Sequence, residues 1–98
     1  MAVLRDPDGI ETRVLHDLID FAGLMVLEIG CGDGRLTWRY ADQAASVLAI
    51  DPRAADIAAA RAQTPDALRS RVAFAVADIT SVDLPVAAFD VAILAWSL

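Results

Sequence analysis

The sequence predicts an α/β fold with parallel strands, and two observations near residue 30 carry this prediction. A short apolar run from Leu24 to Ile29 has the length and branching of a strand that is buried on both faces. A helical pattern begins at Arg35, and the turn between the two has glycine at positions 30, 32 and 34. Such a turn allows positive φ and close packing, and we expect its N–H groups to face a ligand above the carboxyl end of the strand.

Composition limits the class of protein. The chain has 98 residues, of which 57% are hydrophobic and 22% charged, as expected for one small packed domain. Its net charge is -6, and all eight basic residues are scattered arginines, so we expect no direct contact with nucleic acid. No apolar run is long enough for a membrane span and no secretory signal is visible, so a cytoplasmic protein is the expectation.

Charge around the glycine turn indicates the kind of ligand. The dinucleotide pattern G-x-G-x-x-G places its third glycine one position after Gly34, where this chain has Arg35. Glu28 and Asp33 add two negative charges beside the turn. These carboxylates would repel a diphosphate but suit a ligand that carries an ammonium and a sulfonium group. The sequence therefore favours a cationic nucleoside over a dinucleotide.

The segment from Glu28 to Gly34, E-x-G-x-G-x-G after an apolar strand, resembles the first motif of the class I S-adenosylmethionine-dependent methyltransferases. Three later segments are similar to the second, third and fourth strands of that family: Ser46–Asp51, Val72–Ile79 and Phe89–Leu94. The resemblance implies a Rossmann-like three-layer sandwich with parallel strands in the order 3-2-1-4. Because the family has seven strands, residues 24–98 resemble a truncated, cofactor-binding half of its domain.

The resemblance also implies a set of residues that bind S-adenosylmethionine. Glu28 would hold the methionine ammonium directly or through water, Asp51 the ribose, and Asp78 with Ile79 the adenine. The full cofactor-binding set is Glu28, Gly30, Cys31, Gly32, Gly34, Asp51, Pro52, Asp78, Ile79 and Trp96. No metal ligands are expected. No catalytic residue is assigned, because the family's acceptor pocket and any general base usually follow the fourth strand.

Asp51 is the most informative residue of the set. It follows Gly30 by 21 residues, the separation at which an acid at the tip of the next parallel strand meets the ribose hydroxyls of a bound nucleoside. A second role is also open, since Asp followed by Pro52 is a common start of a helix, with the carboxylate as N-cap. The two roles are compatible.

The remaining elements follow from local signals. Asp8 and Glu11 predict a capped helix that runs to about Ala22 and stops at Gly23, so residues 1–23 form an N-terminal helical segment before the half-domain 24–98. Helices are also expected over residues 35–43, with Leu36 and Tyr40 on one face, and over residues 52–63. An outer strand over residues 71–77 is expected to place Val72, Phe74 and Val76 on one side.

The only cysteine and the only histidine are not expected to take part in catalysis. Cys31 is a small side chain in a crowded turn, and the sequence offers no second cysteine for a disulfide or a metal site. His16 lies opposite the apolar stripe of its predicted helix, which indicates a solvated surface residue.

Three functions remain open at this point. The first is the cofactor-binding portion of an S-adenosylmethionine-dependent methyltransferase whose acceptor is unknown. The alternatives are a fragment of an NAD- or FAD-binding Rossmann oxidoreductase and a non-catalytic, methyltransferase-like interaction module.

In the order 3-2-1-4 the strand Phe89–Leu98 would lie at an open edge, so we expect self-association through it, weak cofactor binding and no methyl transfer by this chain alone.

Overall fold

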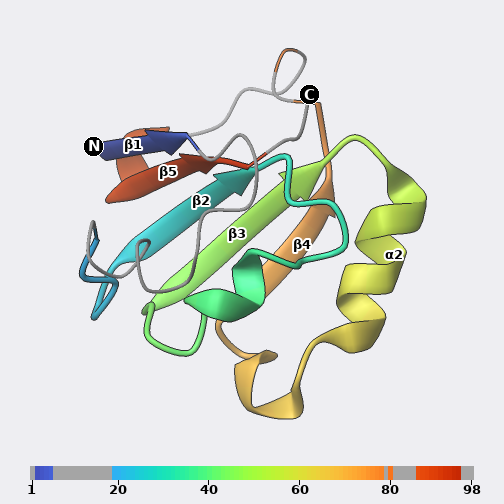
Figure 1. The fold of residues 1–98 in the computed structure, drawn as a ribbon, viewed down its shortest axis with the longest axis horizontal. Helices are drawn as coiled ribbons and strands as arrows, with labels where there is room; N and C mark the ends of the chain where they lie inside the picture. Colours follow the sequence, from blue (N-terminus) through green and yellow to red (C-terminus); the bar gives the residue numbers. More distant parts are fainter. Residues whose placement is uncertain (1, 6–18, 79, 81–85, 96–98) are drawn as a thin grey trace.

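The computed structural model describes residues 2–5, 19–78, 80 and 86–95. Five parallel strands form one sheet in the order β1-β5-β2-β3-β4 (Figure 1). The strands are β1 (Ala2–Arg5), β2 (Met25–Ile29), β3 (Ser46–Asp51), β4 (Val72–Val76) and β5 (Val91–Leu94). The predicted order 3-2-1-4 is confirmed, because β4, β3, β2 and β5 are adjacent in that sequence.

Strand β1 was not predicted, and it changes the edges of the sheet. Ala2 pairs with Val91 and Arg5 with Leu94, so β5 lies between β1 and β2. The prediction that the strand within Phe89–Leu98, here β5, forms an open edge is therefore wrong. The structural basis of the expected self-association through β5 is removed. Among the described strands the edges are β1 and β4. At β4, the Arg61 guanidinium donates to the Phe74 carbonyl at 2.7 Å, which occupies a group that could otherwise pair with another strand.

Within the described residues, one α-helix and three short 3-10 helices lie between the strands. The helix α2 spans Ala54–Gln63, and the 3-10 helices are η1 (Thr37–Arg39), η2 (Asp66–Leu68) and η3 (Val86–Ala88). The predicted helix over 52–63 is present but begins after Arg53, so Pro52 is not its first residue. No helix within the described ranges is long and apolar enough to cross a bilayer.

The segment predicted as a helix over residues 35–43 contains only the single 3-10 turn η1. Its backbone bonds are of mixed type: Trp38 N–H donates to the Gly34 carbonyl four residues back, while Arg39 N–H donates to the Leu36 carbonyl three residues back. A 3-10 helix has three residues per turn, so side chains at i and i+3 lie on the same side. This places Thr37 and Tyr40 together, which a regular α-helix would not do as closely.

Most of the predicted N-terminal helix, including Asp8, Glu11 and His16, lies outside the described residues. Over its described end, residues 19–22, the backbone is not helical. Gly23 follows with a φ of +75°, as expected of a glycine that ends a segment before a strand.

The largest buried cluster lies on the face of the sheet that α2 and η1 cover, and Leu27, Ile50 and Ala92 are buried on the other face. The register aligns Val26 with Val47 and Val47 with Val72, so a row of valines crosses the sheet under these elements. Val76 was predicted to share this face, but it is 49% exposed at the end of the edge strand. The buried cluster includes Phe21, Val26, Leu36, Tyr40, Val47, Ala49, Ile57, Ala60, Val72, Phe74, Val91 and Ile93.

Candidate functional site

The carboxyl ends of β2, β3 and β4 lie at the same edge of the sheet (Figure 1), and each is followed or ended by an acidic residue. Glu28 is near the end of β2, Asp51 ends β3, and Asp78 comes two residues after β4. Backbone bonds join these ends. Gly30 N–H donates to the Ile50 carbonyl at 2.8 Å, and Ala77 N–H donates to the Asp51 carbonyl at 3.1 Å. The structure thus brings these three acids to one rim.

The glycine turn has the conformation that its sequence demands. Gly30, Gly32 and Gly34 all have positive φ, between +57° and +94°. At Gly34 there is a second constraint, because a Cβ would lie 2.9 Å from Cζ2 of Trp38. Trp38 in turn meets Phe74 edge to face, with 5.5 Å between the ring centroids. The third glycine therefore allows an indole ring to pack against the turn.

The backbone N–H groups of this turn are used inside the protein. Gly30 N–H and Cys31 N–H both donate to the Ile50 carbonyl, and Gly34 N–H donates to the Cys31 carbonyl at 3.1 Å. Gly32 N–H donates to Oδ2 of Asp51 at 3.0 Å. The prediction that the turn directs its N–H groups toward a ligand is therefore wrong for these four residues. They hold the turn against β3 and do not form an anion cradle.

Asp51 links the glycine turn to the connection that precedes α2. Oδ2 accepts the Gly32 N–H, and Oδ1 accepts the Arg53 N–H at 2.9 Å. Arg53 is the N-cap of α2, and no side chain caps that helix, so the predicted N-cap role of Asp51 is wrong. Its side chain is mostly buried, with 8% of the residue exposed. Each carboxylate oxygen has two lone pairs, so both retain capacity for one more donor.

Glu28 is fully buried in this structure. Its Oε1 accepts hydrogen bonds from the Thr37 hydroxyl at 2.8 Å and from the Tyr40 hydroxyl at 2.5 Å. Burial, followed by the charge of Glu28, raises the pKa of Tyr40 well above its usual range, so the phenol stays protonated and can donate. The sequence analysis did not find this role of Thr37 and Tyr40; the only signal was two hydroxyl residues three positions apart after the turn.

Asp33 and Arg35 form an exposed ion pair beside the turn. Arg35 Nε lies 3.4 Å from Oδ1 of Asp33, and the Arg35 side chain is largely in solvent. A pair of this kind contributes about 0 to 1 kcal/mol to stability. Arg35 offsets part of the charge that the sequence analysis assigned to Asp33, whereas Glu28 and Asp51 are the buried carboxylates of the candidate site.

The adenine end of the predicted site is described only in part. Asp78 is exposed, and its Oδ1 accepts the Thr80 N–H at 3.0 Å and the Thr80 hydroxyl at 2.8 Å. The bond from the Thr80 N–H, followed by that from its hydroxyl, lowers the pKa of Asp78. Ile79 and Trp96 lie outside the described residues. Ala95 N–H donates to the Ile29 carbonyl at 2.8 Å, which places the chain just before Trp96 beside the end of β2.

Cys31 has the properties of a structural thiol. It is buried, and its Sγ contacts the Gly32 carbonyl at 3.6 Å. Burial, followed by the nearby charges of Glu28 and Asp51, raises the pKa of Cys31 to about 12. A thiol of this kind stays protonated near neutral pH and is a poor nucleophile. The interpretation of Cys31 as a small side chain without a nucleophilic role is consistent with this environment.

We expect Cys31 to resist alkylation while the protein is folded. The pKa is raised from 9.0 to about 12, so the folded state binds the thiol proton more tightly than the unfolded state does. The stability from this group is complete below pH 9 and is lost as the pH rises toward 12. Iodoacetamide labelling at pH 8.5, with and without urea, should be much faster in urea; equal rates would show that the thiol is accessible in the native state.

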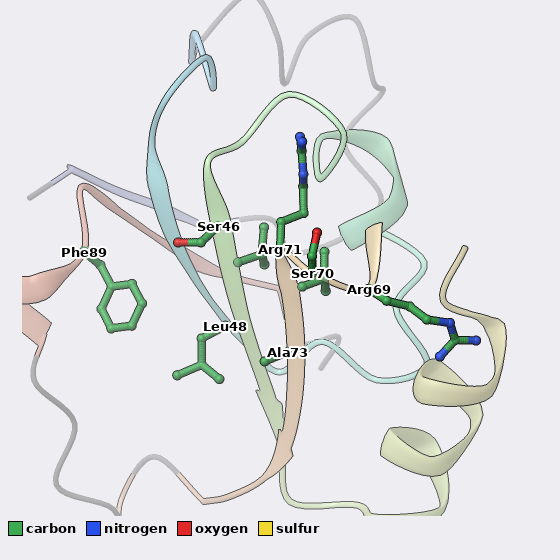
Figure 2. Close-up of a pocket in the computed structure, with 9 residues that line it drawn as sticks. Ser46, Leu48, Arg69, Ser70, Arg71, Ala73 and Phe89 are labelled. Carbon is green, nitrogen blue, oxygen red and sulfur yellow. The ribbon is translucent and has the colours of Figure 1, made fainter. Parts of the chain in front are cut away.

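A cavity of about 290 Å³ lies at the opposite ends of the strands from these acids. It lies at the amino ends of β3 and β4, and Leu48 and Phe89 form part of its lining (Figure 2). Figure 2 shows Arg69 and Arg71 extending away from Phe89, and Arg71 Nη1 donates to the Asp42 carbonyl at 2.9 Å. The two guanidinium groups therefore do not turn this hollow into an anion site, and the carboxyl ends of the strands remain the candidate site.

Comparisons with known proteins show which solved structures this chain resembles. An S-adenosylmethionine-dependent methyltransferase from Mesorhizobium loti is 32% identical over 88% of this chain, with a TM-score of 0.65. The [4+2]-cyclase SpnF is 27% identical over 91% of the chain, with a TM-score of 0.71. Magnesium protoporphyrin IX methyltransferase from Synechocystis PCC 6803, solved with bound SAH, has 22% identity over 85% of the chain, with a TM-score of 0.68, and shares the fold.

This chain spans only part of each of these proteins, 36% of the first and 37% of each of the other two. No match was found among curated proteins. A family profile for the methyltransferase domain matches residues 26–98, which is most of the chain. The chain therefore belongs to the methyltransferase domain family, within the class I S-adenosylmethionine-dependent methyltransferases, as its sequence pattern predicted.

Proposed function

We propose that this chain is the cofactor-binding part of an S-adenosylmethionine-dependent methyltransferase. The observation that carries the proposal is the bond between Gly32 N–H and Asp51, which fixes the glycine turn beside the acid at the tip of the next strand. An acid at this position with free lone pairs suits the two hydroxyls of a ribose. The methyltransferase from Mesorhizobium loti, at 32% identity, supports the same assignment.

The residues present fit this cofactor better than a dinucleotide. Bound there, S-adenosylmethionine supplies a methyl group that its sulfonium already activates. Asp51 would accept the ribose hydroxyls and Asp78 the adenine amine, while Glu28 would attract the methionine ammonium. The N–H groups of Gly30, Cys31, Gly32 and Gly34 are already bonded within the protein, so a diphosphate would find few donors. This disfavours the oxidoreductase alternative.

The part that this chain plays is to position the cofactor. Transfer of an activated methyl group to a nucleophile depends mainly on alignment and proximity, because the thioether leaves without needing a proton. Asp51 and the glycine turn provide that alignment at a rigid sheet edge. The acceptor and any general base are not assigned to residues of this chain.

Binding of S-adenosylhomocysteine tests the proposal by calorimetric titration. Replacing Asp51 with alanine should weaken affinity at least about tenfold, because a hydrogen bond to a charged group contributes about 1.5 to 3 kcal/mol. Asp51→Asn keeps the shape and one carbonyl oxygen, so its loss should be smaller. Asp66→Asn is the matched control, since Asp66 is exposed and its carboxylate pairs with Arg69, the residue just after η2.

Two results would overturn the proposal or its central residue. If the folded wild-type chain gives no heat at saturating ligand, or if NAD rather than S-adenosylhomocysteine raises the melting midpoint, the cofactor is wrong. If the wild type binds but Asp51→Ala binds equally well, the role of Asp51 is wrong. Circular dichroism melts of each variant exclude unfolding as the cause, since Asp51 also accepts two backbone N–H groups.

Cofactor binding without methyl transfer is the second candidate function. It is supported by the 27% identity to the [4+2]-cyclase SpnF, a protein named for a different reaction. Incubation of this chain with methyl-labelled S-adenosylmethionine and cell extract tests the second candidate. Label transferred to an extract component contradicts it, whereas binding without transfer is expected of both candidates, because the chain spans only 36% of the methyltransferase from Mesorhizobium loti.

A further inference from the structure

The polar cluster beneath the glycine turn is the starting point. Thr37 and Tyr40 both donate to the same oxygen of Glu28, at 2.8 and 2.5 Å, and all three residues are completely buried. Placing a carboxylate in a protein interior costs several kcal/mol unless donors compensate. A purely structural core is often as stable or more stable with apolar residues at such positions. Three polar groups concentrated here point to a role in the site.

The place of the cluster in the chain connects it to the turn. Glu28 lies two residues before Gly30, and Thr37 lies three residues after Gly34. The bonds from Thr37 and Tyr40 to Glu28 therefore close the chain across the base of the glycine turn, while Asp51 holds the turn from β3. The turn is thereby held from two sides by carboxylates.

Tyr40 is held from a second side by an aromatic ring. Phe21 stacks on it with 4.6 Å between ring centroids and 16° between the planes. This contact fixes the ring, so the hydroxyl is aimed at Glu28 without freedom to turn away. Removing the hydroxyl alone leaves the stacked pair in place, which separates the hydrogen bond from the packing.

We infer that Thr37 and Tyr40 are positioning residues that hold the Glu28 carboxylate in place for the ammonium end of the cofactor; this inference rests on the proposed function. Because Glu28 is fully buried, it acts through its electric field, which a low-dielectric interior screens weakly. Without the two hydroxyls the buried carboxylate loses two donors that fix its position. It is then no longer held in place for the ammonium, and the attraction is weakened.

Two ligands distinguish this role from a merely structural one. S-adenosylhomocysteine carries the ammonium, whereas 5′-methylthioadenosine has the same nucleoside and thioether without the amino-acid part. The variant Thr37→Val/Tyr40→Phe should lose about tenfold in affinity for S-adenosylhomocysteine, and about threefold or less for methylthioadenosine. Both affinities are measured by calorimetry on the complete chain.

Matched variants control for folding. Thr37→Ser keeps the hydroxyl and should retain wild-type preference for S-adenosylhomocysteine, while Thr37→Val should not; this pair carries the test if the double variant fails to fold. Thr64→Val removes another buried hydroxyl, which donates to the Ala60 carbonyl away from the site, and should leave the ratio of the two affinities unchanged.

The binding results distinguish failure of the proposed function from failure of the positioning role. A wild-type chain that does not bind S-adenosylhomocysteine contradicts the proposed function. A wild type that binds, with variants that weaken both ligands equally or neither, contradicts the positioning role and leaves the proposed function standing. Selective loss of S-adenosylhomocysteine, restored by Thr37→Ser, supports the inference.

Discussion

Replacing Phe21 with alanine is expected to bring the domain close to unfolding. Phe21 is completely buried and stacks on Tyr40. Truncation of a buried phenylalanine costs about 3 to 5 kcal/mol, and small domains have only about 5 to 15 kcal/mol in total. For a domain of this size the melting midpoint should fall by roughly 12 to 40 °C. Urea unfolding followed by circular dichroism measures the loss.

Phe21→Leu is the matched control for this prediction. Leucine keeps an apolar side chain and fills part of the space, so its cost should be clearly smaller than that of alanine. The difference between the two variants reports the value of the apolar volume that leucine restores, and the loss from wild type to Phe21→Leu reports the value of the ring on Tyr40. A loss below about 1 kcal/mol for Phe21→Ala would contradict the placement of this residue in the core.

Replacing Gly34 with alanine is expected to cost about 2 to 5 kcal/mol, from two separate causes. Its φ of +94° disfavours any residue with a Cβ, and that atom would meet the Trp38 ring at 2.9 Å. The free energy of unfolding, again from urea titration, gives the total. Affinity for S-adenosylhomocysteine should fall as well, since the alanine displaces either the turn or the indole.

Gly23→Ala separates the two causes. Gly23 also has a positive φ, +75°, but a Cβ there would meet nothing within 4 Å. Its cost should therefore be the backbone strain alone, about 1 to 2 kcal/mol. If Gly34→Ala costs no more than Gly23→Ala, then contact with Trp38 does not constrain the turn. Adding Trp38→Leu to Gly34→Ala should recover part of the loss, because neighbouring substitutions are not additive.

The sheet could be predicted from the sequence because buried parallel strands are nearly continuous apolar runs. This pattern identified β2 and β5, alternation indicated the outer strand β4, and the family resemblance supplied β3 and the order of the four. β1 has only four residues, and its strand conformation depends on pairing with β5, which local sequence does not encode. A helix over 35–43 was predicted from the spacing of apolar residues, but the segment forms only a 3-10 turn. In that conformation the hydroxyls of Thr37 and Tyr40 both donate hydrogen bonds to Glu28.

The site was predictable to the extent that it depends on strand ends. Glu28 and Asp51 lie at the rim where spacing placed them, because the carboxyl ends of parallel strands share one edge. The hydrogen bonds of the turn were not predictable in the same way. Gly32 N–H reaches Asp51 across 19 residues, and a bond between distant residues leaves no periodic signal. The buried donors to Glu28 were missed for the same reason.

The pairing of β1 with β5 has a consequence for the kinetics of folding. Ala2 pairs with Val91, so nearly the whole chain must be brought together before the bonds between these strands form. Closing so long a loop is entropically costly, and contacts of this range slow the folding of a domain. During synthesis on the ribosome, β1 emerges before the other described strands and waits without its partner until β5 follows. The earliest of these five strands to emerge thus depends on the latest of them for its pairing.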